Sequence, residues 1–357
     1  MTTTARASGE PMVIGGTAVP LGESRSIDLP VSRLVTHTEM TMPVRVVRGA
    51  REGPSLFVCA AVHGDEICGV EIIRRLLSHK ALTELTGTII AVPVVNVFGF
   101  IAHSRYLPDR RDLNRMFPGS ERGSLAARLA HLFMSEVVAN ATHGIDIHTG
   151  ALHRANLPHV RVRSQTAETW KLAEVFGVPL VLQSDLRDGS LREAVAQMGK
   201  PVLMFEAGEA LRFDEWAIKA GLSGVLNVMV HLGMIGPEHA SRTLDRPPVY
   251  AESSTWVRAQ ESGIVHSECV LGATVQKGER LATVGDPFGE NEIDVVAPCD
   301  GIVVGRSNIP LVYEGDALFH IARVTPTADI EQSLAAFQSA IGAPDRFDPE
   351  DGPPSEM

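Results

Sequence analysis

The sequence is poor in several features that mark special classes of protein. Only four of its 357 residues are cysteines, and Cys59, Cys68, Cys269 and Cys299 lie in separate segments without Cys-x-x-Cys spacing. This usage indicates neither a disulfide framework nor a thiolate zinc site. No apolar run approaches the ~20 residues that span a bilayer, so we expect no membrane partner.

Basic residues and a leader are lacking as well. The 32 lysines and arginines are outnumbered by 43 aspartates and glutamates, and the formal net charge of −11 argues against a nucleic-acid partner. The first residues contain no apolar signal-peptide core, from which we expect a cytoplasmic protein. What remains is an ordinary globular composition, and a chain of this length is expected to form two domains.

One buried strand organises the rest of the chain. Residues 56–62 are all apolar, which is typical of a strand inside an α/β sheet. His63 and Glu66 follow where this strand ends, and an amphipathic helix comes next. The apolar positions expected on the buried face of that helix are Ile67, Val70, Ile73 and Leu77.

His63 and Glu66 have the spacing of a metal-binding pair. A strand, a tight turn and a helix place them at the carboxyl edge of the sheet, where open α/β sheets bind ligands. An imidazole and a carboxylate three residues apart can meet on one zinc ion, and a catalytic zinc needs a third protein ligand and an open position for water. The alternative is a turn histidine beside a first-turn charge on the helix dipole.

Two further predicted strands end in groups that can take part in chemistry. Residues 144–148 form a short strand with Asp146 and His148 on one face, and residues 201–206 form a buried strand that ends in Glu206. Strands alternate with helices up to about residue 240, which predicts a doubly wound α/β fold with helices on both faces of the sheet.

The ends of parallel strands gather at one edge, so these distant groups can converge. His63, Glu66 and His148 would then form a zinc site of the carboxypeptidase type, with Glu206 beside it as the base. Asp146 either orients the imidazole of His148 or makes a structural hydrogen bond. His148 taken alone could be a satisfied histidine at a strand end.

The long polar segment 96–119 offers an anchor for a substrate. Asn114 and Arg115 put an amide beside a guanidinium, a pair suited to gripping a carboxylate, and Arg105 is a second candidate cation. The alternative is a surface loop with ordinary salt bridges.

The sequence pattern changes after about residue 245, where short runs typical of β-strands alternate with glycine turns. An internal near-repeat here resembles the small barrel or sandwich of biotinyl and lipoyl carrier domains, but the stretch 286–292 lacks the lysine that such carriers modify. We therefore expect four parts: N-terminal edge strands (1–45), a catalytic domain (46–245), an all-β domain (246–324), and a short helix with an acidic, disordered tail (325–357).

Four motifs follow one another in the chain. They are His63-Gly-Asp-Glu66, Asp112-Leu-Asn-Arg115 with Phe117-Pro-Gly, Asp146-Ile-His148, and Phe205-Glu-Ala-Gly208. Over residues 45 to 320 the chain resembles the zinc-dependent succinylglutamate desuccinylase and aspartoacylase family, relatives of the zinc carboxypeptidases.

The resemblance implies roles for the residues at the strand ends. His63, Glu66 and His148 would hold one zinc ion per subunit. Glu206 would deprotonate the zinc-activated water and pass the proton to the leaving amine, and it matches the family motif where the nearby Glu209 does not.

The resemblance also implies how the substrate is held. Asn114 and Arg115 would bind its α-carboxylate, and Arg105 would polarise the scissile carbonyl and stabilise the oxyanion. In the family the corresponding arginine stands closer to the Asp-Leu-Asn-Arg motif than Arg105 does, so Arg110 and Arg111 are the alternatives.

The predicted function is zinc-dependent hydrolysis of the amide bond of an N-acyl amino acid or a similar small amide. One alternative is a zinc carboxypeptidase acting on short peptides, which the crowding effect of the β domain disfavours. Another is a non-catalytic binder of a metal or metabolite. The protein could form a homo-oligomer, and the sequence identifies neither the acyl group nor the amino acid.

Overall fold

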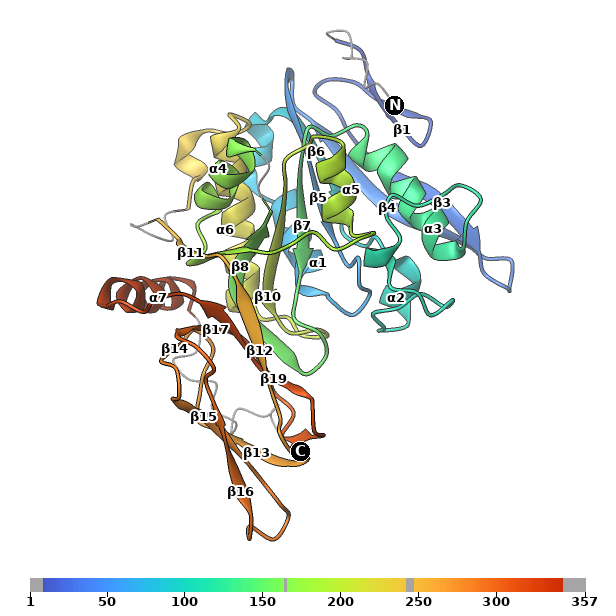
Figure 1. The fold of residues 1–357 in the computed structure, drawn as a ribbon. Helices are drawn as coiled ribbons and strands as arrows, with labels where there is room; N and C mark the ends of the chain where they lie inside the picture. Colours follow the sequence, from blue (N-terminus) through green and yellow to red (C-terminus); the bar gives the residue numbers. More distant parts are fainter. Residues whose placement is uncertain (1–8, 164–165, 242–246, 343–357) are drawn as a thin grey trace, which may run out of the picture.

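The computed structural model describes residues 9–163, 166–241 and 247–342. Within these residues a thirteen-stranded mixed sheet forms the centre of the molecule (Figure 1). Its middle is parallel, in the order β10 (Val202–Gly208), β7 (His143–His148), β5 (Arg51–Ala60) and β6 (Thr86–Val92). These strands run in one direction, so their carboxyl ends share one edge.

Both faces of the central sheet are covered by helices, as the sequence predicts. Leu56, Val58 and Ala60 of β5 belong to one apolar cluster, and Phe57 and Cys59 belong to a second. The first cluster includes residues of α1 (Cys68–Leu77), α4 (Ala167–Phe176) and α6 (Glu215–His231), and the second includes residues of α3 (Leu125–Phe133) and α5 (Leu191–Gln197). Burial on both sides explains why β5 reads as a continuous apolar run.

The buried face of α1 differs from the expected one. Ile73 is buried as predicted, but Val70 and Leu77 are only partly buried, whereas Ile72 and Leu76 are fully enclosed. The helix approaches the sheet most closely at Gly69, where an added Cβ would lie 2.5 Å from the Cβ of Ala60 and 2.8 Å from Ile147 Cγ2. This contact at a glycine sets the rotation of the helix, and apolar periodicity does not register it.

The other side of the sheet is antiparallel and comes from the N-terminal part of the chain. β4 (Glu39–Arg48) pairs with β6, and β3 (Ser24–Arg33) pairs with β4 and forms the edge. A separate small hairpin consists of β1 (Met12–Ile14) and β2 (Thr17–Val19). The loop after β6 contains the short helix α2 (Val97–Ile101) and the 3-10 turn η2 (Leu113–Arg115).

The C-terminal β region continues the central sheet. β8 (Arg154–Val162) pairs with β10 on one side and with β17 (Gly301–Ser307) on the other, and β19 (Ala317–Arg323) and β12 (Ser254–Arg258) follow. Three short strands, β9 (Leu180–Gln183), β11 (Val249–Ala251) and β14 (Thr274–Val275), pair beside this path. The sheet thus passes from the α/β part into the β part without a break.

A second sheet completes this β region as a sandwich. It contains β16 (Glu292–Val296), β15 (Arg280–Gly285), β13 (Gly263–Ser267) and β18 (Leu311–Val312). Leu281 and Val284 of this sheet share one apolar cluster with Val257 and Ile321 of the central sheet. The predicted division of the chain into domains stays a prediction, because the central sheet is common to both regions.

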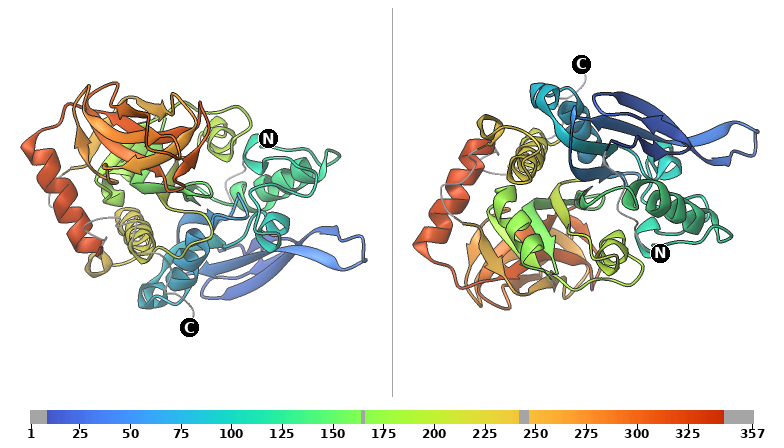
Figure 2. Two further views of the ribbon diagram at one scale, coloured as in Figure 1. Left: turned by 90° about the horizontal axis from the view of Figure 1, so that it is seen from below. Right: turned by 90° about the horizontal axis from the view of Figure 1, so that it is seen from above.

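The chain closes with α7 (Ala328–Ile341), which lies beside α6 and the β region (Figure 2). Phe337 of this helix joins the apolar cluster that contains α6, and Gln338 donates to the backbone oxygen of Leu271 at 3.2 Å. The predicted acidic tail from residue 343 lies outside the described residues. None of the helices in the described part of the chain has the length and apolarity to cross a membrane, and all four cysteines are unpaired.

Candidate active site

The three predicted metal ligands lie together at the carboxyl edge of the parallel strands. Glu66 Oε1 is 2.7 Å from His63 Nδ1, and Glu66 Oε2 is 2.7 Å from His148 Nδ1. Ligand atoms of the three residues lie within 4.8 Å of one another, and all three residues are buried. Two imidazole nitrogens and a carboxylate are a donor set that fits a catalytic zinc ion.

Two aspartates hold the outer nitrogens of these imidazoles. Asp112 Oδ1 lies 3.1 Å from His63 Nε2, and Asp146 Oδ2 lies 2.9 Å from His148 Nε2. Carboxylates in such positions fix the orientation of a ligating imidazole and make it more basic. The sequence left open whether Asp146 orients the imidazole of His148 or makes a structural hydrogen bond, and the structure places its carboxylate against both that imidazole and the thiol of Cys59. Sequence reasoning gave Asp112 no role, although it opens one of the four motifs.

The charge of Glu66 is stabilised by its neighbours. Burial by itself would raise the pKa of Glu66, but the imidazoles of His63 and His148 hold this pKa far below its usual range. Glu66 is therefore ionised near neutral pH, and an ionised carboxylate is the form that coordinates a metal.

The turn that carries His63 and Glu66 is fixed by its backbone. Residues after β6 hydrogen-bond to the end of β5, with Val95 N donating to Ala60 O at 3.1 Å and Asn96 N donating to Ala61 O at 2.9 Å. Gly64 packs directly on α2, and an added Cβ would lie 1.9 Å from the carbonyl carbon of Gly99. Only glycine fits this contact, so α2 and the ligand turn occupy fixed positions relative to each other.

Glu206 lies on β10 directly opposite His148 of β7 in the parallel register. Its Oε2 accepts a hydrogen bond from Asn156 Nδ2 at 2.7 Å, and its Oε1 lies 3.2 Å from Arg161 Nε. Burial raises the pKa of Glu206, but Arg161 and the nearby imidazoles lower it more, and the net pKa lies below its usual value. Glu206 is therefore an ionised carboxylate at neutral pH.

Asn156 and Arg161 were missed by sequence reasoning. Both lie in strand β8, which mixes polar and apolar residues, so no sequence pattern singled them out. The other carboxylate considered, Glu209, has a different setting: it accepts hydrogen bonds from His153 N at 3.2 Å and from Asn308 Nδ2 at 2.7 Å. Glu209 thus joins two loops, and it is not among the residues that line the pocket beside His148.

Of the three candidate arginines, Arg105 lies beside the predicted metal ligands. Its Nη1 is 3.2 Å from Glu66 Oε1, and its Nη2 is 3.0 Å from Asp112 Oδ2. Arg111 instead pairs with Asp109 at 3.1 Å, and Arg110 is exposed. Neither of these two lines the pocket that Arg105 lines.

Asn114 and Arg115 line the same pocket. The side-chain oxygen of Asn114 accepts a hydrogen bond from the backbone N–H of Leu191 at 2.9 Å. Because an N–H can only donate, this bond fixes the amide orientation and leaves the NH2 group of Asn114 as a donor for another acceptor. Arg115 lies next to it as a cation, so the pair has the donors that a carboxylate needs.

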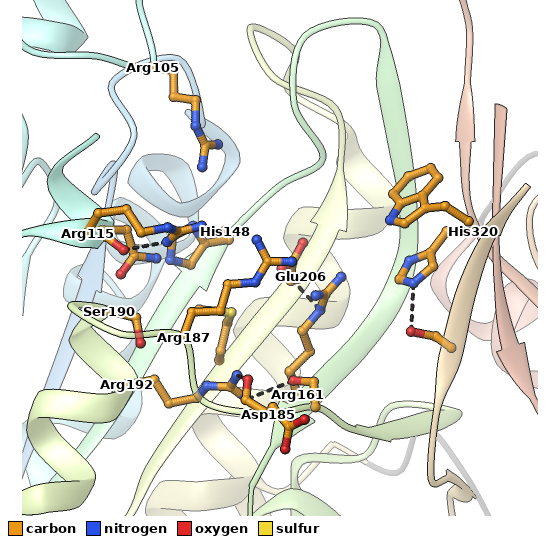
Figure 3. A pocket seen from close by; sticks show the side chains of 15 residues that line it. Arg105, Arg115, His148, Arg161, Asp185, Arg187, Ser190, Arg192, Glu206 and His320 are labelled. Carbon is orange, nitrogen blue, oxygen red and sulfur yellow. Dashed lines mark hydrogen bonds and ion pairs between the residues drawn. The ribbon is translucent and has the colours of Figure 1, made fainter. Parts of the chain in front are cut away.

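The pocket has a volume of about 390 Å³ and is lined by residues of both the α/β part and the β region (Figure 3). Ser254, Trp256 and His320 form the wall contributed by the β region. The rings of Trp256 and His320 are stacked at 4.6 Å with 6° between their planes, and Ser254 Oγ is 2.8 Å from His320 Nε2. Sequence reasoning missed these three residues, because no motif surrounds them.

Comparisons with known proteins identify a matching family and a curated relative. Residues 52–232 match the family model described as the succinylglutamate desuccinylase/aspartoacylase catalytic domain. The N-alpha-acetyl-L-2,4-diaminobutyric acid deacetylase of Halomonas elongata is 27% identical over 296 residues, which are 79% of this chain and 86% of the relative.

Two solved structures resemble the chain over most of its length. A succinylglutamate desuccinylase/aspartoacylase from Rhodobacter sphaeroides is 26% identical with a TM-score of 0.75, and the match covers 84% of this chain and 95% of that one. The product-bound ectoine utilization protein EutE (DoeB) from Ruegeria pomeroyi is 25% identical with a TM-score of 0.77, covering 86% and 98%. The chain therefore belongs to the succinylglutamate desuccinylase/aspartoacylase family and is an enzyme that hydrolyses amide bonds.

Proposed function

We propose that this enzyme is a zinc-dependent deacylase of N-acyl amino acids. One observation carries the proposal: donors for a metal, an ionised carboxylate and the donors for a substrate carboxylate meet around one pocket. The printed name of the Halomonas elongata relative, which describes removal of an acetyl group from an amino acid, supports the same reaction class.

His63, Glu66 and His148 would hold the zinc ion. When bound, zinc lowers the pKa of a water molecule towards ~7 and so supplies a nucleophile at neutral pH. The contacts of Asp112 and Asp146 to the outer imidazole nitrogens would keep both rings in the orientation that coordination needs.

Glu206 would act as the general base and then as the general acid. Its carboxylate is ionised at neutral pH and lies on the strand next to His148. It can take the proton of the attacking water and deliver it to the amine nitrogen as the amide bond breaks. Asn156 and Arg161 would hold the carboxylate in one orientation during both transfers.

Three polar side chains would hold the substrate. The NH2 group of Asn114 and the guanidinium of Arg115 would bind the α-carboxylate, which fixes the amide bond relative to the base. Arg105 would face the carbonyl oxygen and stabilise the negative charge that develops there.

A peptidase that cleaves long substrates is the less favoured function. Trp256, stacked on His320, forms a wall of the same pocket, and this supports a substrate of small size. A carboxypeptidase needs an open path for the peptide chain next to its catalytic centre.

The proposal is tested by metal analysis of the purified protein together with a panel of N-acetyl and N-succinyl amino acids and short peptides. We expect one zinc ion per chain, release of free amino acid from at least one N-acyl amino acid, and loss of this activity on chelation. Stoichiometric zinc with no hydrolysis across the panel, or hydrolysis of peptides alone, would contradict it.

A further inference from the structure

A second group of side chains that can ligate a metal lies away from the pocket. Glu84 ends the 3-10 turn η1 (Lys80–Glu84), and Glu238 and His239 belong to the 3-10 turn η4 (Pro237–His239). One ligand atom from each of these three residues lies within 4.8 Å of the others. None of the three is among the residues that line the active-site pocket, and the proposed reaction uses none of them.

This group lies at the amino edge of the parallel strands, opposite the predicted zinc site. Glu84 comes shortly before β6 begins at Thr86, whereas His63 and Glu66 follow the carboxyl end of β5. The turn η4 follows α6, and the two segments are joined where Thr86 N donates to the backbone oxygen of Met234 at 2.8 Å. A cation bound here would connect the turn before β6 to the end of α6, at a distance from the reaction.

His239 gives the evidence that this group has a ligand. Its side chain is only 9% exposed, and its Nε2 is buried without a hydrogen-bond partner in the part of the chain that the structure describes. Glu238 Oε1 lies 3.5 Å from this nitrogen, but no hydrogen bond joins the two atoms. A buried polar nitrogen is costly to leave without a partner, and a bound cation would supply one.

The separation of these two atoms fits a metal ion between them. Zinc binds imidazole nitrogens and carboxylate oxygens at about 2.0 to 2.2 Å, and two such ligands of a tetrahedral ion are about 3.4 Å apart. His239 Nε2 and Glu238 Oε1 are 3.5 Å apart. A direct ion pair would instead bring them to about 2.7 to 2.9 Å.

The two carboxylates are available to a cation. Neither Glu84 nor Glu238 forms an ion pair with a lysine or arginine within the described ranges. Gly236 leaves room for the carboxylate of Glu238, because an added Cβ at Gly236 would lie 2.2 and 2.4 Å from its two oxygens. The carboxylate of Glu238 therefore folds back over the start of η4, and the exposed side chain of Glu84 can rotate towards an ion.

His79 supports the ring of His239 but is not itself a ligand. The two rings pack edge to face with their centroids 5.9 Å apart. His79 Nδ1 accepts a hydrogen bond from Ala81 N at 3.2 Å, which places the proton of the neutral ring on Nε2. Neither nitrogen then offers a lone pair, so three protein ligands remain and water would complete the coordination.

We propose that Glu84, Glu238 and His239 bind a divalent transition-metal ion, best fitted by zinc, that joins η1 to η4. Two carboxylates with one imidazole favour zinc over calcium and magnesium, which prefer oxygen ligands alone. Two of the three ligands are exposed, so this ion should exchange readily and be lost on dialysis. The protein as purified would then hold only the ion at the buried catalytic site.

Calorimetry on the zinc-loaded protein tests this site. ZnCl2 or CaCl2 is titrated into protein that already holds one zinc ion per chain, so that only further binding is measured. We expect one additional zinc ion per chain and no binding of calcium at the same concentrations. The additional zinc should also raise the temperature of unfolding, because an ion that binds only the folded chain stabilises it.

Three variants assign the additional zinc ion. Glu84→Gln and His239→Gln each remove a ligand, so the affinity should fall at least about 10 to 100-fold, since even the outer partners of a metal contribute that much. Gly236→Ala should weaken binding as well, because its methyl group displaces the carboxylate of Glu238. His231→Gln is the matched control: His231 is an exposed histidine at the end of α6 and outside this group, and its loss should leave the affinity unchanged.

The outcomes separate this site from the catalytic one. Weaker zinc binding in Glu84→Gln and Gly236→Ala, with the control unaffected, supports the site even if the more buried His239 variant fails to fold. A wild-type protein that takes up no additional zinc overturns it, and so does additional zinc that all three variants retain. Calcium bound as tightly as zinc, and equally in His239→Gln, would overturn it too, because the group would then be only an acidic patch. Hydrolysis is not a readout here, so the proposed deacylase function is decided independently.

Discussion

Glu206 is the residue on which the proposed reaction depends most directly. Its two oxygens have different partners, the neutral amide of Asn156 and the cation Arg161. The arginine keeps the carboxylate ionised, while the amide fixes its plane. A base held in this way loses little conformational entropy when it accepts the proton of the attacking water.

Replacing Glu206 with glutamine should separate catalysis from metal binding. The variant keeps the size of the side chain but cannot accept a proton, so kcat should fall by about 10² to 10⁴-fold, the range that a general base contributes. Zinc content should stay at the wild-type level, because Glu206 is not one of the three converging ligands. Both quantities are measured on the same preparation.

Glu209→Gln is the control for that experiment, since Glu209 is three residues away and serves to join two loops. Its kcat should stay close to that of the wild type. A glutamine at 206 with full activity would exclude Glu206 as the base.

Asp146 contacts the outer ring nitrogen of His148, one of the proposed metal ligands. It is fully buried, and its carboxylate lies 2.9 Å from the outer nitrogen of His148. Asp146→Asn should weaken zinc binding by about 10 to 100-fold, because such outer partners typically contribute that much to metal affinity. Competition with a chromophoric chelator measures the affinity, and circular dichroism checks that the fold is retained. Unchanged affinity in a folded variant would reduce the contact to a purely structural one.

At the scale of elements, strand ends explain why much of the site could be predicted. Each parallel strand places its terminal polar residue at the same edge, so His148 and Glu206 could be brought together from separate apolar runs. The helices after the strands and their caps follow from local signals, such as Ser124 accepting from Ala127 N at the start of α3. These features need only neighbouring residues.

What could not be predicted depends on contacts between elements. The close contact at Gly69 determines which face of α1 packs on the sheet, whereas the sequence pattern alone favours a different buried face. Asn156 and Arg161 reach Glu206 because β8 enters the sheet antiparallel to β10. No local sequence pattern predicts this strand pairing, so the sequence did not indicate which residue these polar side chains would contact.

The contact between the ligand turn and α2 gives a test at this scale. Gly64→Ala would force a methyl group against the backbone of Gly99, which must displace the turn that carries His63 and Glu66. We expect a loss of about 1 to 3 kcal/mol of stability, typical of overpacking, together with lower zinc content. Thermal unfolding and metal analysis measure the two effects.

Gly16→Ala is a suitable comparison for the Gly64 variant. Gly16 has a φ of +74° and no atom within 4 Å of an added Cβ, so the alanine should cost about 1 to 2 kcal/mol of stability through the backbone alone. Its zinc content should be normal. Equal zinc content in both alanine variants would show that the turn tolerates the displacement.

At the scale of the whole molecule, the continuous sheet connects the two regions that form the pocket. β17 pairs with β8, and the strands that follow bring Trp256 and His320 opposite each other. The β region therefore acts as one wall of the pocket rather than as a carrier module. The sequence could suggest the sandwich from its glycine turns, but the position of the wall depends on the pairing of β8 with β17.

Trp256 offers the sharpest test of this wall. Its ring stacks on His320 at 4.6 Å and lies 5.4 Å from the guanidinium carbon of Arg154. In Trp256→Ala the pocket should widen, and the ratio of kcat/KM for an N-acyl dipeptide to that for the matching N-acyl amino acid should rise roughly tenfold. Tyr313→Ala removes an aromatic ring of the same region that is 79% exposed and does not line the pocket, and it should leave this ratio unchanged. An unchanged ratio in the Trp256 variant would mean that the selection of small substrates comes from the loops of the α/β part, because the wall formed by the β region would then have no effect on substrate length.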